Sequence, residues 1–329
     1  MTDATPVRWG VLSTARINQK VLAGAREAAG VEIVAVASRE RARGEAFAQR
    51  HGIGRVHGSY EELLADPDVE AVYIPLPNSL HVPWSIKALE AGKHVLCEKP
   101  LTRRAAEADA AFDAAERAGR VLMEGFMWRY HPQTEQLVRL AGEIGPVRVV
   151  RAAFAFLLAL EDLANVRVQA DLQGGALMDV GCYCVSALRL LCGEPERVSG
   201  EAIDRGGVDG RFVGVLRFGS DVLGLFDCGF DVPLRGAIEV VGERGTLLAQ
   251  DPWHGLAPRL TLTRADGTVE EIPVHAANPY GRELEDVSRA IRNGGAPRLG
   301  RADAVGQART IEALYAAAAG RSVALDGIG

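Results

Sequence analysis

A lysine at the end of a predicted buried strand is the first residue whose position suggests chemistry. The apolar residues His94-Val95-Leu96 lead into Cys97-Glu98-Lys99-Pro100. The proline ends the strand because it has no N–H to donate to a neighbouring strand. In open α/β folds, ligands bind beyond the carboxyl ends of the strands. We therefore expect Lys99 to work on a bound ligand, and Glu98 to line the same site.

A second group lies much further along the chain. Asp179 and Tyr183 are four residues apart in a predicted helix over Asp179–Leu191, so they share one face of it. Tyrosine has a pKa of about 10 and is a weak base at neutral pH, but a nearby ammonium group lowers that pKa. Lys99 beside Tyr183 would form a proton-transfer pair and stabilise a developing alkoxide.

Each residue of the second group also has a structural interpretation. Tyr183 lies in an apolar helix, where tyrosine is commonly a core aromatic residue. Asp179 stands at the start of the predicted helix, where aspartate is a favoured N-cap. The catalytic interpretation gives Asp179 a hydrogen bond to a substrate hydroxyl or a role in orienting Lys99.

The first predicted strand runs into a turn of small residues. Gly10-Val11-Leu12-Ser13-Thr14-Ala15 closes the strand and opens the first helix, with small residues at positions 10, 13 and 15. A pyrophosphate needs exposed N–H groups at a helix start and no bulky side chain in its way. The turn therefore predicts a dinucleotide site formed by Gly10, Ser13, Thr14, Ala15, Arg16 and Ile17. The alternative is a tight strand-to-helix turn without a ligand.

The residues after the second strand bear on the choice of dinucleotide. Ser38-Arg39 stands where a protein that binds NAD usually has an acidic residue for the ribose hydroxyls. A guanidinium bonds two phosphate oxygens at once, so the pair favours NADP, with NAD possible. Arg39 as a solvated surface charge is the alternative.

Weaker candidates follow from position alone. Four candidates stand at or after the end of a predicted strand and could touch the nicotinamide side of the cofactor: Leu76, Pro77, Asn78 and His81. Alternatively, Pro77 and Asn78 form an ordinary helix-capping turn, and His81 is a surface histidine. Arg129 and Arg167 are candidate substrate ligands. Arg129 could instead form an interdomain salt bridge. Tyr280, in a second-domain segment, could also reach the substrate cleft. The seven histidines show no metal-ligand spacing, so no metal is expected.

The elements that must position these residues divide the chain in two. Over residues 1–125, short apolar strands alternate with helices, which predicts an α/β Rossmann domain with a parallel sheet. After Phe126 the strands are longer, and Gly219-Ser220 and Asp266-Gly267 are hairpin signals. We therefore expect residues 126–329 to form an α+β C-terminal domain with a large, mostly antiparallel open-faced sheet, which binds substrate and forms oligomers.

Composition excludes several classes of protein. The net charge is −6 with 24% charged residues, which offers no basic surface for nucleic acid or an acidic membrane. No apolar run approaches the ~20 residues of a membrane span, and residues 1–6 do not resemble a signal peptide. The five cysteines are odd in number and match no zinc or redox motif. We expect a cytoplasmic protein with reduced thiols and a small-molecule substrate.

Taken together, these residues resemble the glucose–fructose oxidoreductase / inositol dehydrogenase (Gfo/Idh/MocA) family. The matching stretches are Arg8–Ala15, Glu98–Leu101, Glu124–Pro132 and Gly174–Tyr183, in the family's order. Many inositol dehydrogenase-like members carry Asp and, four residues on, His; here Asp179 is followed by Tyr183. This pattern resembles the dihydrodiol dehydrogenase and NADP-dependent D-xylose dehydrogenase branch.

The resemblance implies an oxidoreductase that uses NADP to act on a CH–OH or C=O group of a sugar, cyclitol or trans-dihydrodiol. It also implies Lys99 and Tyr183 as the catalytic pair, and a homo-dimer or homo-tetramer formed through the second-domain sheet. Two alternatives stay open: an NAD-dependent inositol-type dehydrogenase, and a non-catalytic NADP(H)-binding regulator.

Overall fold

The computed structural model describes residues 5–219 and 221–320, which form two compact units. The first comprises the chain up to His131 together with Ala277–Val305, and the second comprises Pro132–Ala276 and the chain from Gly306 onward. The chain therefore does not divide at one point after residue 125. Residues 126–131 and 277–305, which we expected in the second domain, belong to the first unit.

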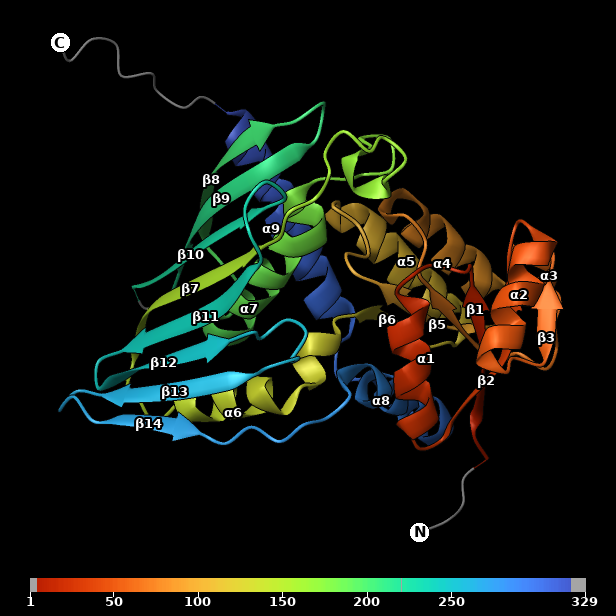
Figure 1. The fold of residues 1–329 in the computed structure, drawn as a ribbon, viewed down its shortest axis with the longest axis horizontal. Coiled ribbons are helices and arrows are strands. Elements are labelled where there is room, and N and C mark those ends of the chain that lie inside the picture. Colours follow the sequence, from red (N-terminus) through yellow and green to blue (C-terminus); the bar gives the residue numbers. More distant parts are fainter. Residues whose placement is uncertain (1–4, 220, 321–329) are drawn as a thin grey trace. The chain divides into compact units, whose positions relative to one another are not determined.

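The first unit is built on a parallel sheet with the strand order β3-β2-β1-β4-β5-β6 (Figure 1). The strands are β1 (Val7–Leu12), β2 (Val31–Ala37), β3 (Arg55–His57), β4 (Ala71–Ile74), β5 (His94–Glu98) and β6 (Leu122–Gly125). All residues of β4, and all of β1 except Arg8, are buried, as expected where helices cover both faces of a sheet. The strand order reverses beside β1, and ligands of such folds bind at this point.

Helices connect the strands of this sheet. They are α1 (Asn18–Glu27), α2 (Arg41–His51), α3 (Tyr60–Ala65), α4 (His81–Glu90) and α5 (Ala105–Ala118), with short 3-10 turns η1 (Asn78–Leu80) and η2 (Met127–Tyr130). Helix α8 (Pro279–Asn293) completes the unit. The alternation confirms the α/β parallel-sheet architecture expected for this part of the chain.

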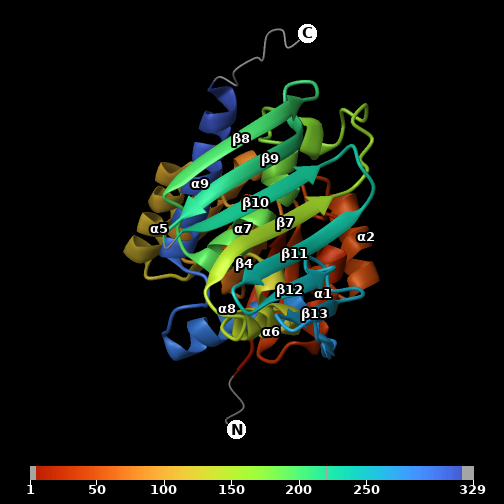
Figure 2. The same ribbon diagram turned by 90° about the vertical axis from the view of Figure 1, so that its left-hand side faces the viewer.

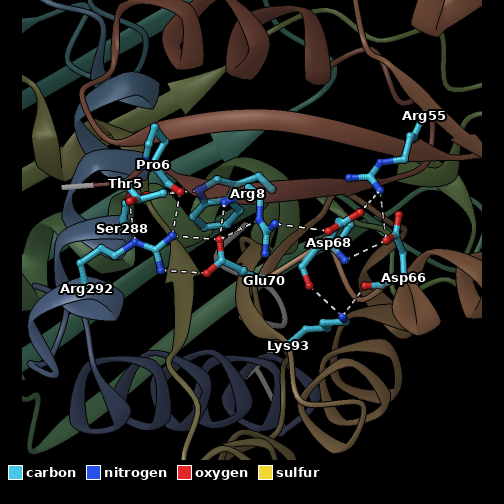
Figure 3. Close-up of polar contacts among 12 residues, drawn as sticks. Thr5, Pro6, Arg8, Arg55, Asp66, Asp68, Glu70, Lys93, Ser288 and Arg292 are labelled. Carbon is cyan, nitrogen blue, oxygen red and sulfur yellow. Dashed lines mark hydrogen bonds and ion pairs between the residues drawn. The ribbon is translucent and has the colours of Figure 1, made fainter. Parts of the chain in front are cut away.

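Polar contacts explain why α8 belongs to the first unit (Figure 3). Nη1 and Nη2 of Arg292 each donate to the carboxylate of Glu70 over 2.8 Å. Nε of Arg8, on β1, lies 3.2 Å from the same carboxylate. The indole N–H of Trp9 donates to Oγ of Ser288 over 3.1 Å. The hydrogen bond from Arg292 holds the pKa of Glu70 at about 2 against its burial, so the carboxylate stays charged.

The second unit is built on a larger sheet with the strand order β14-β13-β12-β11-β7-β10-β9-β8. Its strands are β7 (Val147–Ala155), β8 (Arg197–Asp204), β9 (Asp209–Phe218), β10 (Val222–Gly229), β11 (Arg235–Gly242), β12 (Gly245–Gln250), β13 (Arg259–Arg264) and β14 (Val269–Ile272). Only β7 and β10 pair in parallel among these strands. The expected mostly antiparallel sheet is therefore confirmed.

Helices α6 (Pro132–Ala141) and α7 (Cys182–Cys192) lie behind the sheet in Figure 2. Helix α9 (Arg301–Ala319) begins in the first unit and continues in the second. The 3-10 turn η3 (Val166–Val168) and the π turn η4 (Leu177–Gly181) precede α7. Strands β11 and β12 and helix α6 had not been expected from the sequence.

Both predicted hairpins have the expected strands. Strands β9 and β10 are antiparallel, as are β13 and β14. Of the predicted turn Gly219-Ser220, Ser220 lies outside the described residues. No helix in the described part of the chain combines the length and the apolar character needed to cross a membrane.

Candidate functional site

Lys99 lies directly beyond the end of β5 and is half-buried. The chain after it is held in place, because the N–H of Leu101 donates to Oε1 of Glu124 over 2.7 Å. Glu124 is 2% exposed. The lysine therefore stands at the carboxyl edge of the parallel sheet, where the sequence places it.

His81 connects this segment to the end of β4. Its Nδ1 lies 2.8 Å from the carbonyl oxygen of Pro100, and its Nε2 lies 2.7 Å from that of Leu76. Burial lowers the pKa of His81 to about 4 although both carbonyls raise it, and the charge of Lys99 lowers it as well. The imidazole is therefore neutral near pH 7, and its single N–H donates to one of the two carbonyls only. The alternative of a surface histidine is wrong, since His81 is 1% exposed.

Pro77 and Asn78 form the turn between β4 and α4. The carbonyl of Pro77 accepts a hydrogen bond from the N–H of Leu80 over 2.8 Å, as an ordinary helix-start turn would. The turn also follows the strand that neighbours β1. Both interpretations of these two residues are therefore compatible with the geometry.

Glu98 belongs to a partly buried group of polar side chains that the sequence did not reveal. Its Oε1 accepts the hydroxyl hydrogen of Tyr73 over 2.5 Å. Glu283 of α8 is 3% exposed, and burial, followed by the charge of Glu98, raises its pKa well above the ordinary range. Tyr73 reaches Glu98 because β4 and β5 are adjacent and in register. Glu283 is distant from both in the sequence and comes near Glu98 because α8 belongs to the first unit.

The turn after β1 has the features of a phosphate site. Ser13 has φ of 109°, a left-handed conformation that favours glycine and is held here by a serine. Its N–H donates to the carbonyl of Ala37 over 3.0 Å. Within the described residues, the N–H groups of Thr14, Arg16 and Ile17 donate to no protein atom. These donors stand at the start of α1, where an anion is favoured.

Gly10 is explained by packing. It lies inside β1, and a Cβ there would come within 2.7 Å of Cδ2 of Leu63 on α3. The structure gives this glycine a role in bringing α3 close to the strand, several residues before the open N–H groups. Its direct contact with a cofactor stays a prediction.

The end of β2 carries the two residues expected to distinguish the dinucleotides. The N–H of Ser38 donates to the carbonyl of His57 over 3.1 Å, and Ser38 is buried. Arg39 is exposed and lies close to Tyr60. Burial raises the pKa of Tyr60, while the charges of Arg39 and Arg43 and a hydrogen bond from Arg39 oppose that rise. The guanidinium groups of Arg39 and Arg43 therefore both lie near the phenol of Tyr60.

Two candidates have contacts within the first unit. Nη1 of Arg129 lies 3.6 Å from Oδ1 of Asp303, and the Arg129 side chain is only 10% exposed. The salt bridge we considered for Arg129 is therefore present, but inside one unit. Tyr280 also belongs to the first unit and not to a second-domain segment; its N–H donates to Asn278 over 3.2 Å at the start of α8.

The second unit brings Arg167, Asp179 and Tyr183 together. Nε of Arg167 donates to Oδ2 of Asp179 over 2.6 Å. The nearby charge of Asp179 raises the pKa of Arg167, as does Tyr183 to a smaller extent. Arg167 comes from η3, Asp179 from η4 and Tyr183 from the first turn of α7. The expected proximity of Asp179 and Tyr183 is thus extended by Arg167.

Tyr183 is 6% exposed and lies among aromatic rings. Its ring centroid is 5.4 Å from that of Phe154 on β7 and 5.8 Å from that of Trp253 in the loop after β12. Phe154 and Trp253 stack on each other at 5.7 Å. These rings fix the orientation of the phenol, so a core position and a chemical role are compatible in this residue.

The N-cap role considered for Asp179 is wrong. The helical segment begins before it, and the N–H of Leu177 donates over 2.6 Å to Oδ2 of Asp209 on β9. Asp209 also accepts the hydroxyl hydrogen of Tyr315 on α9 over 2.8 Å. Burial raises the pKa of Asp209 to about 6 against these hydrogen bonds. No local sequence signal identifies this cap, because it comes from a strand 32 residues later.

Metal ligation has no support in the described ranges, 5–219 and 221–320. No group of three or more His, Cys, Asp or Glu side chains there is arranged to hold a metal ion.

Comparison with known proteins adds to this geometry. Residues 7–126 match the model of the oxidoreductase family Gfo/Idh/MocA with an NAD-binding Rossmann fold, and residues 133–248 match the Gfo/Idh/MocA C-terminal domain. The chain is 43% identical over 325 residues to D-xylose 1-dehydrogenase (NADP(+)) 2 of Haloferax volcanii, covering 97% of this chain and 99% of that protein. It is 34% identical to a trans-1,2-dihydrobenzene-1,2-diol dehydrogenase of Danio rerio, covering 88% and 89%.

Among solved structures, the chain resembles a 3-ketoreductase from Actinomadura kijaniata in complex with NADP and TDP-benzene. The TM-score is 0.89 at 31% identity, covering 95% of this chain and 98% of that one. Two similar structures are variants of that ketoreductase, one with a lysine replaced by alanine and one with a tyrosine replaced by phenylalanine. The two replaced positions are separated by the same number of residues as Lys99 and Tyr183.

Proposed function

The chain belongs to the Gfo/Idh/MocA family of NAD(P)-dependent dehydrogenases and reductases, and from this premise we propose its reaction. It is an NADP-dependent oxidoreductase that acts on a CH–OH or C=O group of a sugar, cyclitol or trans-dihydrodiol. One observation carries the proposal: Lys99 stands at the same carboxyl edge of the parallel sheet as the Ser13 turn and Arg39.

The residues of this edge fit a dinucleotide. The N–H groups of Thr14, Arg16 and Ile17 are oriented by the Ser13 turn and would hold the pyrophosphate. Arg39 and Ser38 would bind the 2′-phosphate of NADP. A guanidinium suits a phosphate better than a ribose hydroxyl, because it bonds two phosphate oxygens at once. The xylose dehydrogenase relative, named for NADP(+), and the ketoreductase crystallised with NADP support this choice over NAD.

The remaining residues proposed for the cofactor follow the neighbouring strands. They are Gly10, Ala15, Leu76, Pro77, Asn78, His81, Glu98 and Lys99. His81 would act from between the segments around Leu76 and Pro100, with its single N–H bonded to the carbonyl of one of them. Glu98 would line the site from the end of β5, where its carboxylate accepts the hydroxyl hydrogen of Tyr73.

In the proposed mechanism, Tyr183 and Lys99 handle the proton. The nicotinamide, when bound, supplies or accepts the hydride. In reduction, the phenol of Tyr183 gives its proton to the substrate oxygen, and the ammonium of Lys99 stabilises the phenolate left behind. In oxidation the phenolate takes the hydroxyl proton. The matching spacing of the replaced lysine and tyrosine in the ketoreductase variants supports this pair.

Arg167 and Asp179 would recognise the substrate. The pair offers N–H donors and carboxylate acceptors beside Tyr183, which suits a substrate with neighbouring hydroxyl groups. The names of the xylose and dihydrobenzenediol dehydrogenases are those of compounds with such hydroxyls. Arg129 is kept as a further proposed substrate ligand, because its ion pair with Asp303 over 3.6 Å uses only part of a guanidinium that has five N–H donors.

We further propose a homo-dimer or homo-tetramer that uses the sheet of the second unit. Strand β9 alternates, with Phe212 and Leu216 fully buried while Val213 and Val215 are 47% and 38% exposed. Leu223 on β10 is 43% exposed. Apolar side chains that share an open sheet face favour burial against a second copy. Light scattering of Val215→Asp, compared with the unchanged protein, tests this assembly.

A substrate panel tests the reaction. The purified protein is assayed with NADP and NAD against aldoses, cyclitols and trans-dihydrodiols, and with NADPH against keto-sugars. We expect turnover with NADP on at least one polyol, and a loss of at least ~100-fold in kcat in both Lys99→Met and Tyr183→Phe. NADPH binding, followed by its fluorescence, should persist in Tyr183→Phe.

Each other outcome points to a specific correction. Normal turnover in either variant removes the assigned catalytic pair. Efficient turnover of inositol with NAD, unaffected by Arg39→Ala, supports an inositol-type dehydrogenase. Tight NADPH binding without turnover across the panel supports a regulator and overturns the enzymatic proposal.

A further inference from the structure

The helical segment that carries Asp179 and Tyr183 begins irregularly. Residues Leu177–Gly181 form a π turn that leads directly into α7. Such turns are rare and occur frequently at functional sites, because they displace side chains from the positions of a regular helix. An irregular turn needs other groups to satisfy its backbone.

Buried side chains from other elements bond the backbone at the start of this turn and directly after its end. Oδ2 of Asp209 accepts the N–H of Leu177 over 2.6 Å. Nε2 of Gln307 donates to the carbonyl of Cys182 over 2.8 Å. Asp209 and Gln307 are 7% and 1% exposed. The first residue of the turn and the first residue of α7, which follows it, are therefore each hydrogen-bonded to a buried side chain.

Helix α9 supports both ties. The hydroxyl of Tyr315 donates to Oδ1 of Asp209 over 2.8 Å, and Gln307 lies two turns earlier on the same helix. Gly175 shows how closely these groups approach the turn. Its φ is +118°, and a Cβ there would lie 2.2 Å from Oδ1 of Asp209. Only glycine fits that position without displacing the carboxylate.

The same segment also sets the place of Arg167. The N–H of Gly175 donates to the carbonyl of Arg167 over 2.9 Å, and the N–H of Asp179 donates to the carbonyl of Gly175 over 3.0 Å. The backbone around Gly175 thus connects Arg167 to Asp179, in addition to the ion pair between their side chains. Movement of the π turn would displace Arg167, Asp179 and Tyr183 together.

We propose that three residues position Asp179 and Tyr183 for the reaction: Tyr315 and Gln307 of α9, and Asp209 of β9, which Tyr315 holds. These three residues are here called the α9 brace. This inference rests on the proposed function, and it adds three positioning residues that do not touch substrate or cofactor. The brace holds the phenol of Tyr183 at the place where proton transfer occurs. Small displacements of a proton-transfer group reduce kcat strongly, whereas cofactor binding in the first unit is unaffected.

The test compares four variants of the full chain. Tyr315→Phe removes one hydroxyl and keeps the ring, which contacts Phe212. Asp209→Ala removes both acceptors, and Asp209→Asn keeps one. Thr310→Val is the matched control: its buried hydroxyl on α9 donates only to the carbonyl of Gly306 in its own helix. Steady-state kinetics and hydrogen–deuterium exchange of residues 177–183 are measured for each.

We expect Tyr315→Phe and Asp209→Ala to lower kcat at least ~10-fold with the KM for NADP unchanged within twofold. Asp209→Asn should recover part of the loss, and Thr310→Val should match the unchanged protein. Amides of residues 177–183 should exchange faster in Tyr315→Phe and Asp209→Ala only. If Asp209→Ala does not fold, Tyr315→Phe and Asp209→Asn carry the test.

Two results overturn the brace. One is unchanged exchange of residues 177–183 in Tyr315→Phe. The other is faster exchange there with an unchanged kcat, which would make the brace purely structural. Absence of turnover in the unchanged protein refutes the proposed function instead, and the exchange measurement then still judges the brace separately.

Discussion

Nε of Arg167 lies 2.6 Å from Oδ2 of Asp179, and the two residues come from separate short helical segments of one unit. The Asp179 side chain is 17% exposed and that of Arg167 is 42% exposed. One end of the ion pair is therefore protected while the guanidinium remains accessible. The remaining N–H groups of Arg167 can therefore bind a ligand while its Nε still neutralises the charge of the Asp179 carboxylate.

Arg167→Met should raise the KM for the substrate roughly fivefold, because a charged hydrogen bond at a partly exposed site contributes about 1 kcal/mol. Asp179→Asn should act in the same direction, since it releases the guanidinium from its orientation. The KM for NADP should stay within twofold in both variants. Steady-state kinetics with each ligand varied in turn makes the measurement, and an equal rise for both ligands would contradict the assignment.

Arg39→Ala should raise the KM for NADP at least ~10-fold and leave that for NAD unchanged, since a charged hydrogen bond to phosphate contributes about 1.5–3 kcal/mol. The change removes the exposed guanidinium at the end of β2. Arg41→Ala serves as the control, because Arg41 pairs with Glu45 on the surface of α2 over 3.1 Å. A similar effect of both substitutions would indicate a general charge effect and not a phosphate site.

Glu70→Gln should destabilise the first unit near pH 7. Hydrogen bonding to Arg292 holds the pKa of Glu70 at about 2, below its ordinary value of 4.5. The stabilisation is therefore present above pH 4.5 and is lost as the pH falls from 4.5 to 2. The shift corresponds to at most about 3 kcal/mol, and partial exposure reduces the expected effect to about 1–2 kcal/mol.

Calorimetry at pH 7, 4.5 and 3 measures this effect. The melting temperatures of Glu70→Gln and of the unchanged protein should converge as the pH falls. Glu45→Gln, which removes an exposed ion pair, should differ little from the unchanged protein at any of these pH values. A constant difference from pH 7 to pH 3 would show that the charge of Glu70 is not responsible.

His81 should make the protein less stable in mild acid. Burial lowers its pKa to about 4 from an ordinary 6.5, so the folded state binds fewer protons than the unfolded state between these values. Stability is then complete above pH 6.5 and falls as the pH drops toward 4, by up to about 3 kcal/mol. His94, with a pKa also lowered to about 4 by burial, adds to the same loss.

The contribution of His81 is separated by substitution. In His81→Gln the decline in melting temperature between pH 6.5 and 4 should be smaller than in the unchanged protein, because the buried imidazole of His81 is gone. His275→Gln, at an exposed position, should leave the decline unchanged. An identical pH dependence in His81→Gln would mean that the imidazole is not buried in solution.

Local patterns were sufficient for much of the first unit. Short apolar strands alternating with helices predicted the parallel sheet, since a strand buried on both faces must be apolar throughout. The same reasoning placed Lys99 at a strand end, because a proline follows it. The small residues around Ser13 predicted the turn at the start of α1. In each case, neighbours along the chain determine the structure.

Contacts between distant segments decided the rest. Helix α8 joins the first unit through Arg292 and Glu70, and nothing near either residue in the sequence indicates the other. Tyr73 meets Glu98 only because β4 and β5 are adjacent and in register.

Asp179 shows the same limit within the candidate site. The sequence alone determined that it lies near Tyr183 in a helical segment. The tertiary structure decided that Asp209 caps that segment and that Arg167 pairs with Asp179. A cap or an ion pair depends on which groups the folded chain brings within hydrogen-bond distance, and hydrophobic periodicity carries no information about that.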